Sequence, residues 1–135
     1  MRVVIDPGVY VAALITPEGP PAELVRKWRT GAFEVVASPH LLAELTGVMH
    51  RRKFRKWFST READEFIRGI ARLAITITDT EPVRVFTRDP NDDYIVMLAI
   101  TSGSDFIISG DRDLLEARIE IPVLTPRAAI EHVDR

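Results

Sequence analysis

Short apolar runs alternate with longer amphipathic stretches along the chain, and this pattern predicts strands that alternate with helices. The first run, Arg2 to Ile5, is rich in β-branched residues and stops at Asp6-Pro7-Gly8, which is typical of a strand buried on both faces of a parallel sheet. Further strands are expected at residues 33–37, 75–77, 106–109 and 122–124.

Amphipathic segments with helix-start signals lie between these strands. Helices are expected over residues 9–14, over a segment with Leu24, Val25 and Trp28, from Ser38-Pro39 onward, over residues 60–73, from Asp89-Pro90 to Gly103, and from Pro126 onward. Ser59 and Glu62 form a capping box for the helix at 60–73. Strands that alternate with helices predict an α/β fold with a mainly parallel sheet.

Length and composition are those of one globular domain covering residues 1–135. Hydrophobic residues make up 46% of the 135 residues and charged residues 28%, and there is no cysteine. The absence of cysteine excludes disulfides, zinc–thiolate sites and thiol nucleophiles. The longest apolar run, Ile95 to Ile100, is far too short to span a bilayer, and no signal peptide is visible, so we expect a cytoplasmic protein.

Positive charge is concentrated in one segment of the chain. The net charge is −2, yet residues 50–61 contain six basic residues and no acidic one, which leaves −8 on the remaining residues. This segregation predicts an acidic pocket beside a basic rim.

Four acidic residues are expected at one edge of the sheet. Asp6 and Asp111 follow the strands at 2–5 and 106–109, and Glu44 and Asp92 lie in the first or second turns of helices that begin at that edge. Converging carboxylates repel one another unless a cation neutralises them, and Mg²⁺ or Mn²⁺ suits a site with oxygen ligands alone. A cation held in this way can support phosphodiester cleavage.

Each of these acids also has a purely structural interpretation. Asp6 before Pro7 and Gly8 fits an N-cap or a type II turn, and Asp111 fits an ordinary turn residue. Glu44 borders the apolar stripe of its helix, although most glutamates are simply solvated. These alternatives stay open for single residues, but four acids at one edge favour a site.

Three aspartates stand close together at the start of the helix that ends near Gly103. Asp89 is placed as its N-cap, and acids in the first turn are favoured by the helix dipole. Asp92 and Asp93 are similarly placed, so helical periodicity does not decide which of them belongs to a site.

The basic segment at residues 50–61 has two interpretations of equal weight. It is either a solvated helix end or a surface whose cations contact nucleic-acid phosphates while neighbouring aromatic rings stack on bases. Phe54, Trp57 and Phe58 equally fit residues that anchor the segment to the core. The three histidines have no metal-ligand spacing, and we expect structural or solvated roles for them.

The four acids lie in four motifs that follow one another in a specific order. These are Val4-Ile5-Asp6 with Val9-Tyr10, Ser38-Pro39-His40-Leu41-Leu42-Ala43-Glu44-Leu45 followed by Arg51-Arg52-Lys53-Phe54, Asp89-Pro90-Asn91-Asp92-Asp93 with Leu98-Ala99, and Ile108-Ser109-Gly110-Asp111-Arg112-Asp113. In this order, and over nearly the whole chain, they resemble the PIN-domain family of metal-dependent ribonucleases. The resemblance is greatest to the VapC-like toxins of toxin–antitoxin pairs.

This resemblance implies a fold and a set of site residues. The fold is a three-layer, PIN-like and Rossmann-like α/β structure with a mainly parallel central sheet. Carried over by position, the metal-binding and catalytic acids are Asp6, Glu44, Asp92 and Asp111. Asp92 is preferred to Asp93 because the family's acid is the fourth residue of its Asp-Pro-x-Asp run.

The same resemblance implies an activity and partners. It indicates an endoribonuclease that depends on Mg²⁺ or Mn²⁺ and leaves 5′-phosphate ends. It also implies a homodimer and a small antitoxin protein that blocks the site. Arg51, Arg52 and Lys53 are the expected RNA-binding residues.

Some positions depart from the family pattern. Pro7-Gly8 stand where the family has Thr-Asn, Ala12 replaces a serine, and Ser109 replaces a threonine while it keeps the hydroxyl. The lost asparagine amide supports an alternative, a catalytically weak or inactive RNA-binding or regulatory protein. A phospho-receiver domain is a second rival, but it needs an acidic pair directly after the first strand.

Overall fold

Five parallel strands form one sheet in the computed structural model, which describes residues 1–135. The strands are β1 (Arg2–Ile5), β2 (Glu34–Ala37), β3 (Ile75–Thr76), β4 (Phe106–Ile108) and β5 (Val123–Leu124). Their order is β3-β2-β1-β4-β5, and all four pairings are parallel. A receiver domain has the flavodoxin-like order 2-1-3-4-5, so the strand order excludes that rival.

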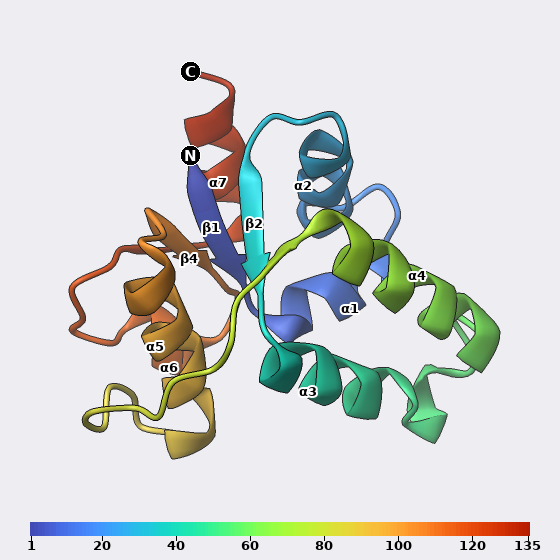
Figure 1. The fold of residues 1–135 in the computed structure, drawn as a ribbon. Helices are drawn as coiled ribbons and strands as arrows, with labels where there is room; N and C mark the ends of the chain where they lie inside the picture. The colour runs from blue at the N-terminus through green and yellow to red at the C-terminus, as the bar shows by residue number, and fades with distance from the viewer.

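Helices cover both faces of this sheet (Figure 1). They are α1 (Pro7–Ile15), α2 (Pro20–Arg29), α3 (Pro39–Met49), α4 (Thr60–Leu73), α5 (Asp93–Ser102), α6 (Arg112–Leu115) and α7 (Pro126–Val133), with 3₁₀ turns η1 (Arg52–Phe54) and η2 (Pro90–Asp92). Helix α5 packs on β1, β2 and β4 from one side, and α1 to α4 lie on the other. The predicted three-layer fold is confirmed. None of the helices combines the length and apolar character that a membrane crossing requires.

The middle strand, β1, forms the centre of the hydrophobic core. Val3, Val4 and Ile5 have no exposed surface, and Val4 pairs with Val36 on one side and Ile107 on the other. A strand covered by helices on both faces needs apolar residues at every position, which explains its unbroken β-branched run.

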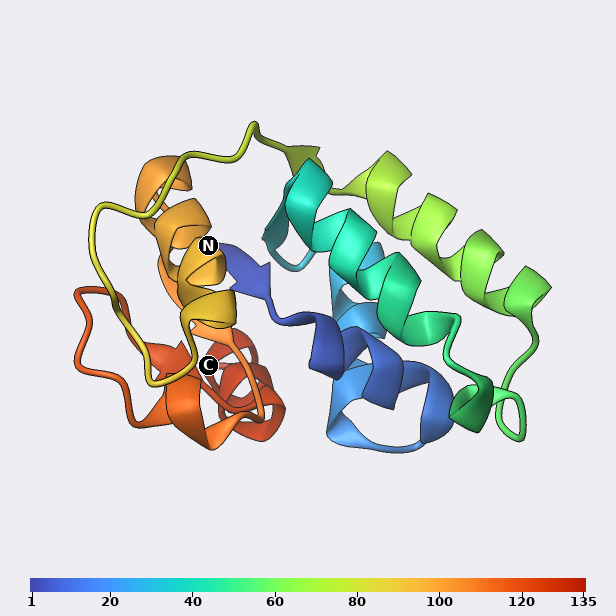
Figure 2. The same ribbon diagram turned by 90° about the horizontal axis from the view of Figure 1, so that it is seen from below.

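Side-chain caps fix where several helices begin. The Ser38 hydroxyl accepts a hydrogen bond from the Leu41 amide at 3.2 Å, ahead of Pro39 in the first turn of α3. The predicted capping box is present, with Ser59 and Glu62 each bonded to the other's backbone amide at 3.0 Å. Helices α3 and α4 lie side by side, as seen from below in Figure 2.

Three local expectations were wrong. Helix α1 begins at Pro7 rather than at residue 9, and Gly8 is not among the glycines with positive φ, so the type II turn is absent. The helix expected from Asp89-Pro90 opens with the 3₁₀ turn η2 before α5 starts at Asp93. Gly110-Asp111 does not form a simple turn, because Asp111 caps the short helix α6.

Candidate active site

The carboxyl ends of β1 and β4 lie next to each other, and chain segments with acidic residues leave the sheet there. The Asp6 amide donates to the Ile108 carbonyl at 2.9 Å, so strand pairing continues up to the first acid. Helices α1 and α6 start at this edge, capped by Asp6 and Asp111. From β1 the chain continues to β2 on one side, and from β4 it continues to β5 on the other side. Ligands of open α/β sheets bind at the point where the strand order reverses in this way.

All four predicted acids line one cavity of about 510 Å³ at this edge. Asp6 and Asp111 come from the strand ends, Glu44 from α3 and Asp92 from the end of η2. Arg51, which follows α3, also lines the cavity. Residues from five separate segments therefore meet where the sequence predicted a site.

Asp6 is oriented by two hydrogen bonds. Its Oδ2 accepts from the Ser109 hydroxyl at 2.7 Å, and its Oδ1 accepts from the Gly8 amide at 3.3 Å. Burial raises the pKa of Asp6, while these two hydrogen bonds lower it and the charges of Asp111 and Glu44 raise it further. The side chain is thus fixed in place yet poorly solvated.

Glu44 is held by an aromatic residue on the opposite side of the sheet. The Tyr94 hydroxyl, at the start of α5, donates a hydrogen bond to Glu44 Oε2. The pKa of Tyr94 is raised, mainly by burial and then by this bond to Glu44, so the phenol stays protonated as the donor. No periodic pattern in the sequence indicates a site role for Tyr94, which lies two residues after Asp92.

Asp93 has a structural role. It is 4% exposed, and its Oδ1 accepts from the backbone amides of Phe86 and Thr87 at 3.0 Å each and from the Thr87 hydroxyl at 3.2 Å. These bonds hold the loop before η2 against α5. The Asp93 carboxylate is therefore used in hydrogen bonds within the protein, unlike the carboxylate of its neighbour Asp92.

Asp92 lines the cavity and has one oxygen without a hydrogen-bond partner. Its Oδ2 is buried and has no hydrogen-bond partner, and its side chain makes no capping bond to α5. The capping bond is made by Asp89 at the start of η2, where its side chain accepts from the Asn91 amide at 3.0 Å. The pKa of Asp92 is raised to about 7, first by burial and then by the charges of Asp6, Asp111 and other nearby acids.

Asp111 combines a capping bond with a position at the cavity. Its Oδ1 accepts from the Asp113 amide at 2.9 Å, and its own amide donates to the Ser109 hydroxyl at 2.9 Å. The side chain is otherwise exposed. The N-cap interpretation and the site interpretation of this acid are therefore compatible.

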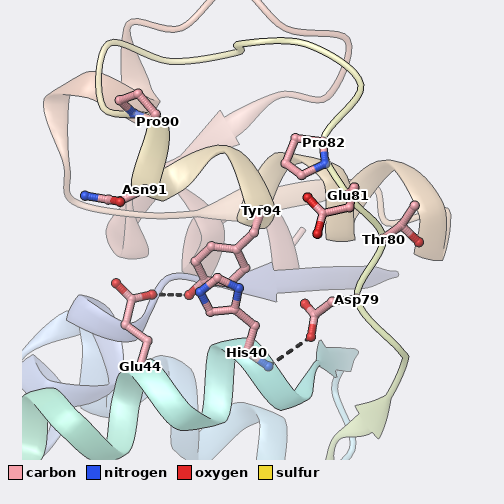
Figure 3. A pocket seen from close by; sticks show the side chains of 9 residues that line it. All are labelled: His40, Glu44, Asp79, Thr80, Glu81, Pro82, Pro90, Asn91 and Tyr94. Carbon is pink, nitrogen blue, oxygen red and sulfur yellow. Dashed lines mark hydrogen bonds between the residues drawn. The ribbon is translucent and has the colours of Figure 1, made fainter.

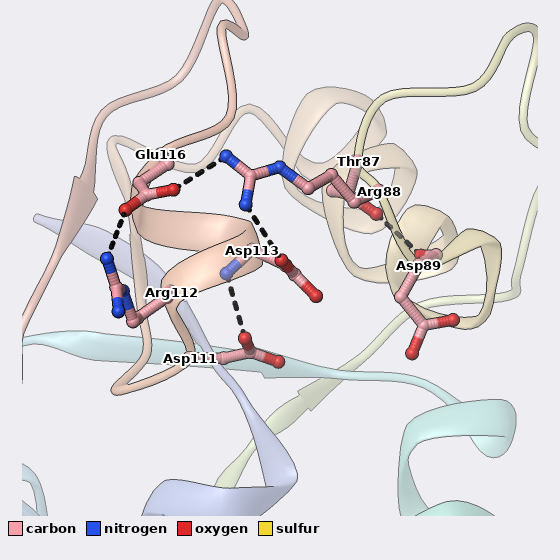
Figure 4. Close-up of polar contacts among 7 residues, drawn as sticks. All are labelled: Thr87, Arg88, Asp89, Asp111, Arg112, Asp113 and Glu116. Carbon is pink, nitrogen blue, oxygen red and sulfur yellow. Dashed lines mark hydrogen bonds and ion pairs between the residues drawn. The ribbon is translucent and has the colours of Figure 1, made fainter.

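An arginine links the loop before η2 to helix α6 (Figure 4). Arg88 Nη2 lies 2.7 Å from Glu116 Oε2, and its Nη1 lies 3.7 Å from Asp113 Oδ1. The Thr87 hydroxyl donates to the Asp89 carbonyl at 2.5 Å within the same loop. The segments that carry Asp92 and Asp111 are thus tied together at the surface.

The basic segment divides into residues with different environments. Arg55 donates from its guanidinium to the Met49 carbonyl and so closes the end of α3. Phe58 is buried in the core, whereas Trp57 is 45% exposed. Arg51 reaches the acidic cavity, and the exposed Arg52 and Lys53 follow it on η1. Arg55 and Phe58 therefore anchor the segment to the fold, while Arg51, Arg52 and Lys53 leave their charges at the surface beside the cavity.

The acidic cavity fits a hard divalent cation in charge and donor chemistry. Its ionisable donors are carboxylates, and the buried Asp92 oxygen has no partner in the protein. As the side chains stand, no group of three or more has the spacing to hold a metal ion. Binding a cation would require the carboxylates to rotate toward one point.

Comparison with known proteins identifies the family. The PIN domain family matches residues 2–113. The chain belongs to the PIN-domain family. Members of this family are nucleases, which hydrolyse phosphodiester bonds. The acidic cavity is consistent with that activity.

One curated protein and two solved structures are similar to this PIN-domain protein, and the structures share its fold. The uncharacterized protein MJ1680 of Methanocaldococcus jannaschii is 26% identical, over all of this chain and 93% of that protein. The crystal structure of VapBC2 from Rickettsia felis, bound to a DNA fragment from its promoter, matches with a TM-score of 0.66 at 12% identity, over 93% of this chain and 98% of that chain. The crystal structure of PAE2754 from Pyrobaculum aerophilum matches with a TM-score of 0.67 at 13% identity, over 98% of this chain and 88% of that chain.

Proposed function

We propose that this PIN-domain protein is an endoribonuclease that depends on Mg²⁺ or Mn²⁺. One observation carries the proposal. Four carboxylates converge on a single cavity in which the buried Asp92 oxygen has no partner and Arg51 stands at the border. A cluster of this kind needs a cation, and a cationic rim suits a phosphodiester substrate.

The acids would divide the work of holding the cation. In this proposal Asp6, Glu44 and Asp92 bind it, and Asp111 positions a second cation or a water molecule. The bound cation supplies Lewis acidity to the scissile phosphate and offsets the charge that develops there. Ser109 keeps Asp6 turned toward the cavity, and Tyr94 does the same for Glu44.

RNA is the proposed substrate because of the exposed cations beside the cavity. Arg51 borders the acids, and Arg52 and Lys53 extend the positive surface along η1. These three side chains would bind backbone phosphates on either side of the scissile bond.

Cleavage of a mixed RNA pool tests this function. Purified protein should cleave RNA with Mn²⁺ or Mg²⁺ and leave 5′-phosphate ends, and excess EDTA should stop cleavage. Asp92→Asn should abolish it, whereas Asp105→Asn, at an exposed site outside the cavity, should not. Cleavage that persists in EDTA, or in Asp92→Asn, contradicts the proposal.

The biological setting we propose is that of a toxin in a toxin–antitoxin pair. The shared fold with VapBC2 supports this setting. The protein would act in the cytoplasm as a homodimer whose site a small antitoxin blocks. Expression should arrest growth for the wild type but not for Asp92→Asn, and light scattering should give twice the 15.2 kDa chain mass.

A non-catalytic RNA-binding role is the second candidate, and Gly8 is the observation that favours it. Gly8 lines the cavity without offering a side chain, and a Cβ there would meet nothing within 4 Å. Gly8→Asn would therefore fit and restore an amide beside Asp6. Cleavage that appears only in Gly8→Asn would show that the wild type binds RNA without cutting it.

A further inference from the structure

A second cavity, of about 540 Å³, opens beside the acidic one and shares Glu44 with it. Its other walls come from the start of α3, the loop after β3 and the turn η2 (Figure 3). The residues that line it are His40, Glu44, Asp79, Thr80, Glu81, Pro82, Pro90, Asn91 and Tyr94. A ligand held at the acids can therefore extend into it.

One side of this cavity is a pair of stacked rings. The His40 imidazole lies on the Tyr94 phenol with ring centroids 3.8 Å apart and an angle of 9° between the planes. Tyr94 is buried beneath it, whereas His40 is exposed and lines the cavity (Figure 3). Planar rings of this kind stack on nucleobases.

One hydrogen bond fixes the phenol of the stacked pair, and a second anchors the backbone of His40. The Tyr94 hydroxyl is bonded to Glu44, and the His40 amide donates to Asp79 Oδ2 at 2.9 Å. A surface fixed before binding loses little conformational entropy when a ligand stacks on it.

The polar groups of the cavity select against phosphate. No lysine or arginine lines it, and three of its nine lining residues are acids. One Asp79 oxygen is already bonded to His40, whereas the exposed Glu81 carboxylate is turned toward the stacked rings (Figure 3). A carboxylate pairs best with two adjacent N–H donors, and guanine offers them at N1 and N2, whereas uracil has one.

We propose that this cavity binds a guanine base of the RNA, stacked on His40 and paired through its N1–H and N2–H groups with Glu81, next to the phosphate that a cation bound by the acids would hold. The proposal rests on the proposed ribonuclease function for its substrate. It adds a base preference that the four acids cannot provide, because they contact only the backbone.

Nucleoside binding tests the cavity independently of catalysis. The ring protons of His40 are followed by NMR in EDTA with guanosine, inosine and uridine, after assignment with His40→Ala. Guanosine should shift the His40 ring protons most and should bind about tenfold more tightly than uridine. Inosine should bind with intermediate affinity because it lacks the 2-amino group. Equal affinity for guanosine and uridine, or no shift with either, overturns the proposal.

A matched pair of variants tests the base edge. Glu81→Gln should weaken guanosine binding about tenfold and leave uridine unchanged, whereas Glu131→Gln, exposed on α7, should alter neither. Unchanged guanosine binding in Glu81→Gln contradicts the assignment.

Cut-site sequencing then connects the cavity to cleavage. Wild-type cuts should fall beside guanosines, and the cuts that His40→Ala makes should lose this preference. Cuts placed without regard to guanosine overturn the proposal. Guanosine binding without any cleavage would support the cavity and contradict only the nuclease function, so the two failures are distinguishable.

Discussion

Ser109 donates a hydrogen bond of 2.7 Å to Asp6, a residue 103 positions earlier in the sequence. The same hydroxyl accepts from the Asp111 amide at 2.9 Å, and Ser109 itself is completely buried. One serine thus sets the relative position of two acids from neighbouring strands. Its role is that of a positioning residue.

Ser109→Ala should raise the pKa of Asp6 further, because the hydroxyl bond now lowers it. Loss of a hydrogen bond to a charged group should also reduce the free energy of unfolding by about 1.5–3 kcal/mol. Ser109→Thr keeps the hydroxyl and should retain cleavage. The pH profile of cleavage checks this prediction, and an unshifted profile in Ser109→Ala would contradict it.

The raised pKa of Asp92 makes stability depend on pH. Its pKa is about 7 in the folded protein and near 3.8 in the unfolded chain, so between these values the folded state binds the extra proton. The free energy of unfolding should therefore fall as pH rises from about 4 to 7. Asp92→Asn cannot ionise, so in EDTA it should be more stable than wild type at pH 8 and lose this advantage near pH 4.

Urea denaturation across this pH range checks that expectation. Glu131→Gln, on an exposed helix surface, should follow the wild-type curve. Parallel curves for Asp92→Asn and wild type would show that Asp92 keeps an ordinary pKa.

Added Mn²⁺ should stabilise the wild type more than Asp92→Asn. A ligand that binds only the folded state adds about 2.7 kcal/mol at a hundredfold excess over its Kd. Thermal melts with EDTA and with Mn²⁺ measure the difference. An equal shift for both proteins would remove Asp92 from the cation site.

Asp93→Ala should be far more destabilising than Asp92→Ala. It would leave the buried amides of Phe86 and Thr87 without their acceptor, at a cost of about 2 kcal/mol or more. Asp92→Ala removes no hydrogen bond of this kind. Chemical denaturation of both variants checks the prediction, and similar losses would contradict the distinct roles of the two residues.

Replacement of Arg51, Arg52 and Lys53 with glutamine should weaken RNA binding and its dependence on salt. Each lost phosphate contact on a single strand flattens the slope of log K against log salt by about 0.7. The control changes Arg68, Arg72 and Arg127 to glutamine, which removes the same charge from other exposed sites. Equal slopes for the two triple variants would show that the basic segment does not bind RNA.

Features with local causes were predictable from the sequence. The strand at 2–5, the capping box at Ser59 and the helix at 60–73 depend on short-range patterns, and the structure has each of them. The meeting of four acids at one edge was also predictable, because parallel strands place their carboxyl ends together.

Contacts between distant segments were not predictable in this way. The stacking of His40 on Tyr94 depends on how α3 and α5 approach each other, and neither residue has a distinctive pattern around it. The difference between Asp92 and Asp93 depends on the path of residues 86–87, which periodicity cannot describe. The helix α6 is only four residues long, too short for an amphipathic signal.

The shared hydroxyl of Ser109 also has a consequence for folding. Asp6 and Asp111 come together only after β4 has paired with β1, a contact between the beginning and the last third of the chain. Such long-range pairing closes late and slowly in folding. An incompletely folded chain would therefore contain all four acids but no assembled site. Nuclease activity would appear only after β4 had paired with β1.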